Sequence, residues 1–341
     1  MEKRAGEQTV IFSRPVGILA AASVVGKKEG EGPLGHLFDI VEEDAMFGTK
    51  SWELAESKFA EAATQACVRK ANLQMTDFDY VIAGDLLNQS TGSVYGLRNT
   101  NRPYLGIFGA CSAMGEGMSL GAMLIDGGFA QDIIACASSH FCSAEKQFRF
   151  PLEMGSQRPP TSSWTVTGAA AVALTSKPTK IAITAATTGK MVDMKMKDAS
   201  NMGAAMAPAA ADTIVAHLKD TQRPPKYYDV IVTGDLGYVG SELLLQLTSK
   251  VGYDISAIHM DCGIEIFDKD KQDTNAGGSG CACSGVVFSA FFYEELKKGS
   301  MKRILFVPTG AFMSPISIQQ GESIPSIAHA VAIENTQGGS V

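Results

Sequence analysis

Basic residues are too few and too scattered in this sequence for a nucleic-acid-binding protein. Across 341 residues, 29 lysines and arginines stand against 36 aspartates and glutamates, a formal net charge of −7. Binding to a phosphate backbone needs a clustered basic face. The basic stretch "KMVDMKMKD" at 190–198 carries compensating acids and is interpreted as a solvated loop. We therefore predict no nucleic-acid partner.

Long apolar runs are also missing. A membrane-spanning helix needs about 18 or more consecutive apolar residues, and no stretch approaches that length. The apolar segment after Arg14 begins "PVGILAAASVVG" and has a counterpart later in the chain, which favours a first strand over a signal peptide. The sequence predicts neither a transmembrane segment nor a signal peptide.

The seven cysteines lack the even number and the regular spacing of a disulfide framework. The closely spaced pair in "CAC" (281–283) supplies two thiols, whereas a closed metal site needs about four ligands. Packing at a tight turn is the simpler interpretation. We predict reduced thiols, no metal site and no cofactor.

Apolar residues and glycine, by contrast, are abundant. The composition is 45% hydrophobic and 19% charged with 35 glycines, and strand candidates such as "YDVIVTG" are continuous apolar runs. Such strands are typical of a sheet covered by helices on both faces. Apolar residues at helical spacing in 51–73 predict a surface helix packed on that sheet. The fold class indicated is α/β.

One stretch, "VTGDLGYVGSELLLQL" (232–247), resembles the start of a dinucleotide-binding unit. A strand turns through three glycines into a helix, an acid follows at Asp254, and "YEELK" at 293–297 has the Tyr-x-x-x-Lys spacing of short-chain dehydrogenases. The interval between Gly240 and Tyr293 is too short, however, for the further strand–helix units that such an enzyme needs. A lone glycine motif is weak evidence.

An internal repeat explains the same stretch better. "DYVIAGDL" (79–86) matches "DVIVTGDL" (229–236), and the segment around "GACSAM" (109–114) matches the one around "GCACSG" (280–285). "VGILAAASVVG" and "KIAITAATTG" are a third pair, in the same order along the chain. Self-similarity of this kind takes precedence over local motifs. We predict two copies of one βαβ-type plan.

These repeats, with a cysteine turn in the first copy and the glycine-rich turn "NAGGSGCACSG" in the second, resemble the thiolase superfamily. The resemblance implies two tandem halves, 1–178 and 179–341, packed as five αβαβα layers. It also implies that Cys111 stands at the position of the acyl-accepting nucleophile. A thiol at a helix N-terminus is expected to have a lowered pKa.

A closer resemblance extends over nearly the whole chain. "IAGDLLNQ", "GIFGACSAMGEGM", "SSHFCSAEKQFRFPLEMGSQRPPTSSWTVTGA", "DCGIEIFD" and "AGGSGCACSG" look like the stage V sporulation protein AD family of spore-forming bacteria. This resemblance implies binding of dipicolinic acid (pyridine-2,6-dicarboxylate, DPA) and its uptake into the developing spore. It further implies a peripheral place at the spore inner membrane and membrane proteins of the same uptake system as partners. Whether calcium accompanies DPA, and whether the two-fold homodimer common in the superfamily forms, is left open.

Catalytic activity is not expected, because condensing members of the superfamily place basic partners beside the nucleophile. They have a histidine where this chain has Gly234 or Asp235, and an asparagine or histidine where the glycine-rich turn offers serine, glycine or cysteine. Each positioned acid or base contributes about 10²- to 10⁴-fold to the rate. We predict a non-enzymatic binding protein, the alternative being an acyl-transferring condensing enzyme that uses Cys111.

A site for a flat dianion needs cationic or N–H donors and an apolar slot. Lys146 and Arg149 are the predicted donors, with ring contacts from Phe148 and Phe150, whereas Arg158 is a weaker candidate that can simply anchor its loop. The full set predicted to bind the ligand is Asp85, Cys111, His140, Lys146, Arg149, His259 and Asp261. For both histidines a packing role remains an alternative, and for Asp85 and Asp235 a helix cap or a turn.

Overall fold

The strand order is the same in the two parts of the chain. The computed structural model describes residues 3–148 and 158–336. In the first part the order is β2-β8-β6-β4-β5, and in the second it is β9-β16-β13-β10-β11. Numbered along the chain, both read 1-5-4-2-3, so the predicted duplication is visible as topology. The boundary at 178/179 stays a prediction.

The ten strands of this plan have the following bounds: β2 (Thr9–Gly26), β4 (Tyr80–Gly84), β5 (Tyr104–Gly106), β6 (Asp132–Ser139), β8 (Gly168–Thr175), β9 (Ile181–Thr187), β10 (Val230–Thr233), β11 (His259–Asp261), β13 (Arg303–Val307) and β16 (Ala330–Asn335). Antiparallel pairing of β2 with β9 joins both parts into one sheet. The shorter strands are β1 (Arg4–Ala5), β3 (Ile40–Glu42), β7 (Trp164–Thr165), β12 (Gly278–Ser279), β14 (Thr309–Ala311) and β15 (Ser326–Ala328).

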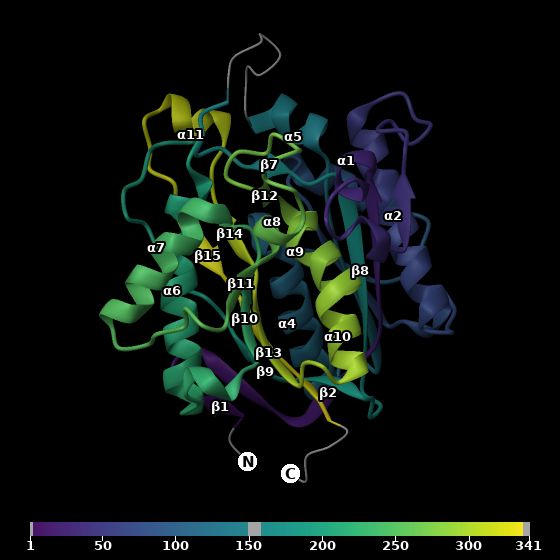
Figure 1. The fold of residues 1–341 in the computed structure, drawn as a ribbon. Coiled ribbons are helices and arrows are strands. Elements are labelled where there is room, and N and C mark those ends of the chain that lie inside the picture. The colour runs from purple at the N-terminus through teal and green to yellow at the C-terminus, as the bar shows by residue number, and fades with distance from the viewer. Residues whose placement is uncertain (1–2, 149–157, 337–341) are drawn as a thin grey trace.

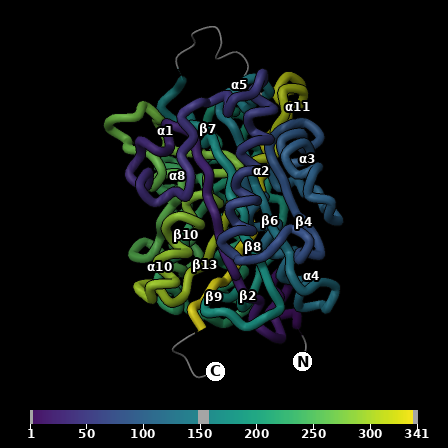
Figure 2. Tube along the Cα trace, turned by 90° about the vertical axis from the view of Figure 1, so that its right-hand side faces the viewer, coloured from purple at the N-terminus to yellow at the C-terminus, as the bar shows by residue number. Residues whose placement is uncertain are grey.

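Helices cover the outer faces of the sheet and also lie between its two parts. Their bounds are α1 (Lys27–Gly30), α2 (Trp52–Lys70), α3 (Thr91–Leu97), α4 (Ala113–Asp126), α5 (Phe141–Phe148), α6 (Met202–Thr221), α7 (Gly237–Lys250), α8 (Cys262–Glu265), α9 (Cys281–Val287), α10 (Tyr293–Lys298) and α11 (Pro315–Gln319). Figure 1 shows α4, α9 and α10 in the middle, α6 and α7 on the left, and α2 on the right. A quarter turn brings α2 in front of β6 and β8 (Figure 2).

Side-chain alternation along the strands produces the layers. On β13, Ile304 and Phe306 point into the central core, whereas Leu305 and Val307 belong to the core under α6. The strands of the first part divide in the same way between the central core and the core under α2. Successive strand residues point to opposite faces, so three cores alternate with the two parts of the sheet. The result is the predicted αβαβα order.

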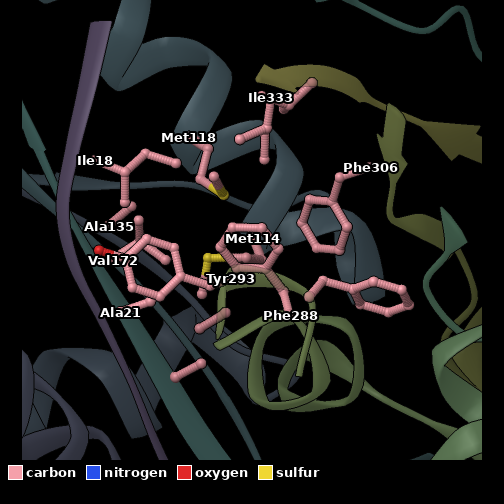
Figure 3. Close-up of a cluster of buried hydrophobic side chains, with 14 of the residues drawn as sticks. Ile18, Ala21, Met114, Met118, Ala135, Val172, Phe288, Tyr293, Phe306 and Ile333 are labelled. Atoms are coloured by element: carbon pink, nitrogen blue, oxygen red, sulfur yellow. The ribbon is translucent and has the colours of Figure 1, made fainter. Parts of the chain in front are cut away.

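The central core is tightly packed around α4 and α9 (Figure 3). Gly285 on α9 makes this contact possible, because a Cβ atom there would lie 2.8 Å from the Ala170 Cβ and 2.9 Å from the Met114 Cε. Aromatic residues, among them Phe288 and Phe306, fill the space beside the helices. Helices this close to two sheet faces need small residues where they touch.

The predicted surface helix at 51–73 is confirmed as α2. Ser51 caps its N-terminus by accepting a hydrogen bond from the Leu54 amide at 3.2 Å. One side of the helix, with Phe59, Ala63 and Cys67, is buried against the sheet. The helix ends at Lys70, earlier than predicted, and Asn72 adopts a left-handed conformation in the turn that follows.

The glycine turn that resembled a nucleotide site is filled by the protein itself. A Cβ atom at Gly237, which has φ = +61°, would lie 2.0 Å from the Ala276 carbonyl oxygen, and one at Gly240 would lie 2.7 Å from the Gly203 carbonyl oxygen. The backbone of Ala276 and of the start of α6 therefore packs directly against these glycines, where a pyrophosphate would have to approach. Within residues 3–148 and 158–336, no helix has both the length and the hydropathy to cross a membrane.

Candidate functional site

Cys111 lies in the short 3-10 helix Ala110–Ser112 that leads into α4. The preceding residue, Ala110, has φ = +49°, a left-handed conformation that costs energy for any residue with a side chain. The second part of the chain holds this turn in place. The Cys281 thiol donates to the Ala110 carbonyl oxygen at 2.9 Å, and a Cβ atom at Gly310 would lie 2.2 Å from the Gly109 carbonyl oxygen.

A small cavity opens beside the Cys111 side chain. Its volume is about 40 Å³, which is room for about three water molecules. Residues from both parts of the chain line it: Leu86, Phe108 and Thr165 from the first, and Met202, Met206, Ser279 and Met313 from the second. The cavity is therefore mostly apolar, with the thiol and two hydroxyl groups as its side-chain polar atoms.

A wider surface groove of about 520 Å³ adjoins this cavity and shares Leu86, Phe108 and Met313 with it. The groove adds short polar side chains, among them Asn88, Ser90 and Ser317. Neither lining contains a lysine or an arginine among the described residues. We refer to the cavity and the adjoining groove together as the funnel.

A buried carboxyl group stands behind the thiol. The hydroxyl of Ser279 lies 3.9 Å from the Cys111 sulfur and donates to the Asp235 carboxylate at 2.8 Å. The Thr309 hydroxyl donates to the other oxygen of Asp235 at 2.6 Å, and the Gly280 amide lies at 3.3 Å. Burial raises the pKa of Asp235, while these hydrogen bonds act in the opposite direction.

The prediction of a lowered pKa for the Cys111 thiol is wrong. Burial, and next the Asp235 carboxylate, raise the pKa of the Cys111 thiol well above its ordinary value. The favourable field of a helix N-terminus is worth about 0.3 to 1 kcal/mol at exposed sites, and desolvation of a thiolate outweighs it here. These surroundings favour the neutral form of the Cys111 thiol over the thiolate.

The two candidate histidines have other partners. In the described residues neither forms a hydrogen bond to Cys111. His140 Nε2 pairs with the Ala45 carbonyl oxygen at 2.8 Å, and His259 Nε2 pairs with the Thr233 hydroxyl at 2.9 Å. Burial lowers the pKa of both imidazoles, that of His259 to about 4, so both are neutral at pH 7.

Asp85 and Asp261 organise backbone at the ends of β4 and β11. Asp85 accepts from the Leu87 amide at 2.8 Å and from the Ser93 amide at 2.7 Å. Asp261 caps α8 and accepts from the Gly237 amide at 2.9 Å, and burial raises its pKa to about 7. The Asp85 contacts match the turn or cap role that was the alternative to ligand binding for this residue.

The predicted cationic residues do not line the cavity where they are described. Lys146 forms an ion pair with Glu53 at 2.7 Å on the protein surface. Arg158 anchors its loop by donating to the Asp273 carbonyl oxygen at 2.5 Å and by stacking on Trp164. Arg149, Phe150 and the Phe148 side chain lie outside the described part. Of the six described members of the predicted ligand-binding set, Cys111 is the one that lines the cavity; for the others, contact with a ligand stays a prediction.

Several cavity residues were missed by the sequence analysis. Ser279 stands in the glycine-rich turn that the repeat already marked, so its place could have been found from the alignment with the first copy. Met202 and Met206 come from α6, which has no motif. Across residues 3–148 and 158–336, no cluster of three or more histidine, cysteine, aspartate or glutamate side chains is arranged to hold a metal ion.

Comparison with known sequences decides the family. The sequence model described as stage V sporulation protein AD (SpoVAD) matches residues 6–334. The stage V sporulation protein AD of Bacillus subtilis (strain 168) is 45% identical over 338 residues, which is 99% of this chain and 100% of that protein. The chain belongs to the stage V sporulation protein AD family.

Solved structures confirm the fold of this family member. The 3-oxoacyl-[acyl-carrier-protein] synthase III from Aquifex aeolicus VF5 covers 94% of this chain, and 99% of its own length is covered, with a TM-score of 0.55 and 12% identity. A histidine-to-aspartate variant of OleA from Xanthomonas campestris has a TM-score of 0.60 at 14% identity, with 95% of this chain and 99% of that chain covered. These identities support the thiolase-like α/β fold and nothing further about activity.

Proposed function

We propose that this family member binds dipicolinic acid in the funnel that ends at Cys111, without catalysing acyl transfer. The bound ligand would serve uptake into the developing spore. The family membership supports a role in sporulation, and the choice of DPA rests on the family resemblance described in the sequence analysis. The geometry around Cys111 supports the non-catalytic part, because its sulfur lies 3.9 Å from the Ser279 hydroxyl and no described histidine, lysine or arginine forms a hydrogen bond to it.

The surroundings of Cys111 favour binding over reaction. A nucleophilic cysteine needs a neighbouring base or cation to favour its thiolate. Cys111 has instead the Ser279 hydroxyl and the acid Asp235, both of which are buried. The negative charge of an ionised Asp235 opposes a second negative charge on the thiol.

The dimensions of the funnel suit a flat aromatic dicarboxylate. The inner cavity has room for a carboxylate and the wider groove has room for a ring, which Phe108 and Met313 can contact where the two spaces meet. The Ser279 and Thr165 hydroxyl groups are the polar side-chain groups at the inner end besides the thiol, and Asn88 and Ser90 are polar groups at the outer end. The ring can enter from the surface with one carboxylate leading.

Transport would require partners that cross the membrane. We propose that the protein works at the spore inner membrane, as a peripheral component beside membrane proteins of the same uptake system. Its part in this arrangement would be to capture DPA and present it to them.

Isothermal titration calorimetry with DPA tests the proposal. We expect saturable heat with a stoichiometry near one, and protection of Cys111 from alkylation by iodoacetamide when DPA is present. Benzoate, which has the ring and a single carboxylate, is the matched control ligand and is expected to bind more weakly. Absence of saturable heat with DPA, together with unchanged alkylation, would refute the proposal.

Acyl transfer is the second candidate, and the backbone at Ala110 is the observation that favours it. Left-handed strain of this kind concentrates at functional sites. Incubation with a panel of acyl-CoA thioesters followed by intact-protein mass spectrometry distinguishes the candidates. An added acyl mass that is absent from Cys111→Ala would establish this activity.

A further inference from the structure

The Ser279 hydroxyl stands between a buried acid and the cavity. Ser279 lines the cavity, and its hydroxyl oxygen lies 3.9 Å from the Cys111 sulfur and 2.8 Å from an oxygen of Asp235. A hydroxyl group has one proton to donate and two lone pairs that accept. The direction in which Ser279 donates therefore depends on whether Asp235 carries a proton.

Two hydrogen-bond arrangements follow from this geometry. When Asp235 is ionised, Ser279 donates inward to the carboxylate and presents lone pairs to the cavity. When Asp235 is protonated, the acid donates to Ser279, and the serine proton is free to point into the cavity. The first arrangement disfavours an anion beside Cys111, and the second provides a donor for it.

The groups that contact Asp235 or interact with its charge are hydroxyl and amide donors, thiols and one other acid. The Thr309 hydroxyl on β14 and the Gly280 amide donate to it, and the Cys111 thiol faces it from the turn before α4. Further neighbours that interact with its charge are Asp261 and the thiols of Cys262, Cys281 and Cys283. In the described residues, these contacts include no lysine, arginine or protonated histidine.

We propose that binding of an anionic ligand in the Cys111 cavity is coupled to uptake of one proton by Asp235, transmitted through the Ser279 hydroxyl. The proton comes from solvent or buffer and adds to the carboxylate, and no covalent bond to the ligand forms. The proposal rests on the proposed function. Ser279 is the positioning residue: through it, protonation of Asp235 lets a site without a described cation accept a dianion.

The direction of the pH dependence follows from linkage. A bound anion favours the protonated form of Asp235, so the pKa of this acid is higher in the complex than in the free protein. Affinity for the anion is then highest below the pKa of Asp235 in the free protein. It falls as pH rises from that pKa to the higher pKa of the complex, and it is constant above that. The limiting slope for one proton is about a tenfold change in Kd per pH unit.

Calorimetry in buffers with different ionisation enthalpies measures this coupling directly. DPA would be titrated between about pH 6 and about pH 9, where its carboxylates are already ionised because ordinary carboxyl pKa values are about 4. We expect wild-type protein to take up as much as one proton per ligand over part of this range. Zero uptake by a wild-type protein that binds DPA would overturn the proposal.

Variants test whether Asp235 is the group that takes up the proton when DPA binds. Asp235→Asn imitates the protonated acid, since its amide can donate to Ser279, and is expected to bind DPA with a Kd that does not change with pH and without proton uptake. Ser279→Ala leaves the acid in place and is expected to reduce both the affinity and the uptake. Uptake in Asp235→Asn equal to the wild-type value would assign the proton elsewhere, with Asp261 as the nearest alternative, and refute the proposal.

Glu29→Gln is the matched control for general pH effects. Glu29 is also fully buried, and burial raises its pKa to about 7, but it does not line the cavity. Proton uptake in this variant should equal that of the wild type, and a loss of uptake would refute the assignment to Asp235. Absence of DPA binding by wild-type protein at every pH is a different result, because it refutes the proposed function itself.

Discussion

Glu29 provides the sharpest test of the electrostatics of this fold. Its side chain is 1% exposed, one oxygen accepts from the Thr167 amide at 2.9 Å, and the other has no hydrogen-bond partner within the described residues. Burial raises the pKa of this carboxyl from 4.5 to about 7. Ionising Glu29 at neutral pH therefore costs folding free energy.

The magnitude and the sign follow from that pKa. Below about pH 4.5 the acid is protonated in both the folded and the unfolded protein, and it contributes nothing. Between about 4.5 and 7 the unfolded chain is ionised while the folded one is not, so stability falls as pH rises. A difference of about 2.5 pKa units at about 1.4 kcal/mol each gives a loss of about 3.5 kcal/mol, which levels off above pH 7.

Glu29→Gln removes this contribution. Urea unfolding of wild type and variant at about pH 5 and about pH 8 gives the stability difference between them at each pH. We expect this difference to move in favour of the variant by about 2 to 3 kcal/mol at the higher pH. The exposed neighbour Glu31, changed to Gln, is the control and should show no such movement.

The reasoning fails if wild type and Glu29→Gln lose stability in parallel between the two pH values. That outcome would mean that Glu29 ionises in the folded protein as readily as in water. Its environment would then be wetter than the burial of its side chain indicates.

Four further predictions concern packing, capping, reactivity and binding. Gly285→Ala should destabilise the protein by about 1 to 3 kcal/mol in urea unfolding, because the new methyl group overlaps the central core, and unchanged stability would show that the core adjusts. Ser51→Ala should cost about 1 kcal/mol through the lost cap of α2, whereas Ser51→Asp should keep it. Alkylation of Cys111 by iodoacetamide should be slow at pH 7 and faster in Asp235→Asn, because the carboxylate that raises the thiol pKa is removed; equal rates would contradict this. Phe108→Ala should weaken DPA binding about tenfold in calorimetry if the ring is contacted where cavity and groove meet, and an unchanged Kd would place the ring elsewhere.

The duplicated architecture could be predicted from the sequence because each strand and helix of the repeat occurs twice along the chain. Twin strands at 79–86 and 229–236 marked equivalent positions, and the structure gives them equivalent places as β4 and β10. The position of Cys111 at the turn into a central helix followed from the same repeat. Local periodicity sufficed for α2 because its apolar spacing extends over many turns.

The chemistry of the site could not be predicted from the sequence, because it depends on what surrounds each group in three dimensions. A helix N-terminus predicted a lowered pKa at Cys111, whereas burial and Asp235 raise it. His259 was a site candidate from its sequence neighbours, but it pairs with Thr233. Sequence spacing does not report desolvation, and desolvation dominates in this cavity.

The contact between the Cys111 turn and the second part of the chain has a mechanical consequence. Cys281 and Gly310 press against the turn from across the molecule, and the cavity walls come from both parts. Any molecule that fills this cavity therefore contacts residues of both parts of the chain and links them. Its binding free energy then opposes separation of the two parts. Ligand binding in this small cavity is therefore expected to raise the free energy of unfolding of the whole chain.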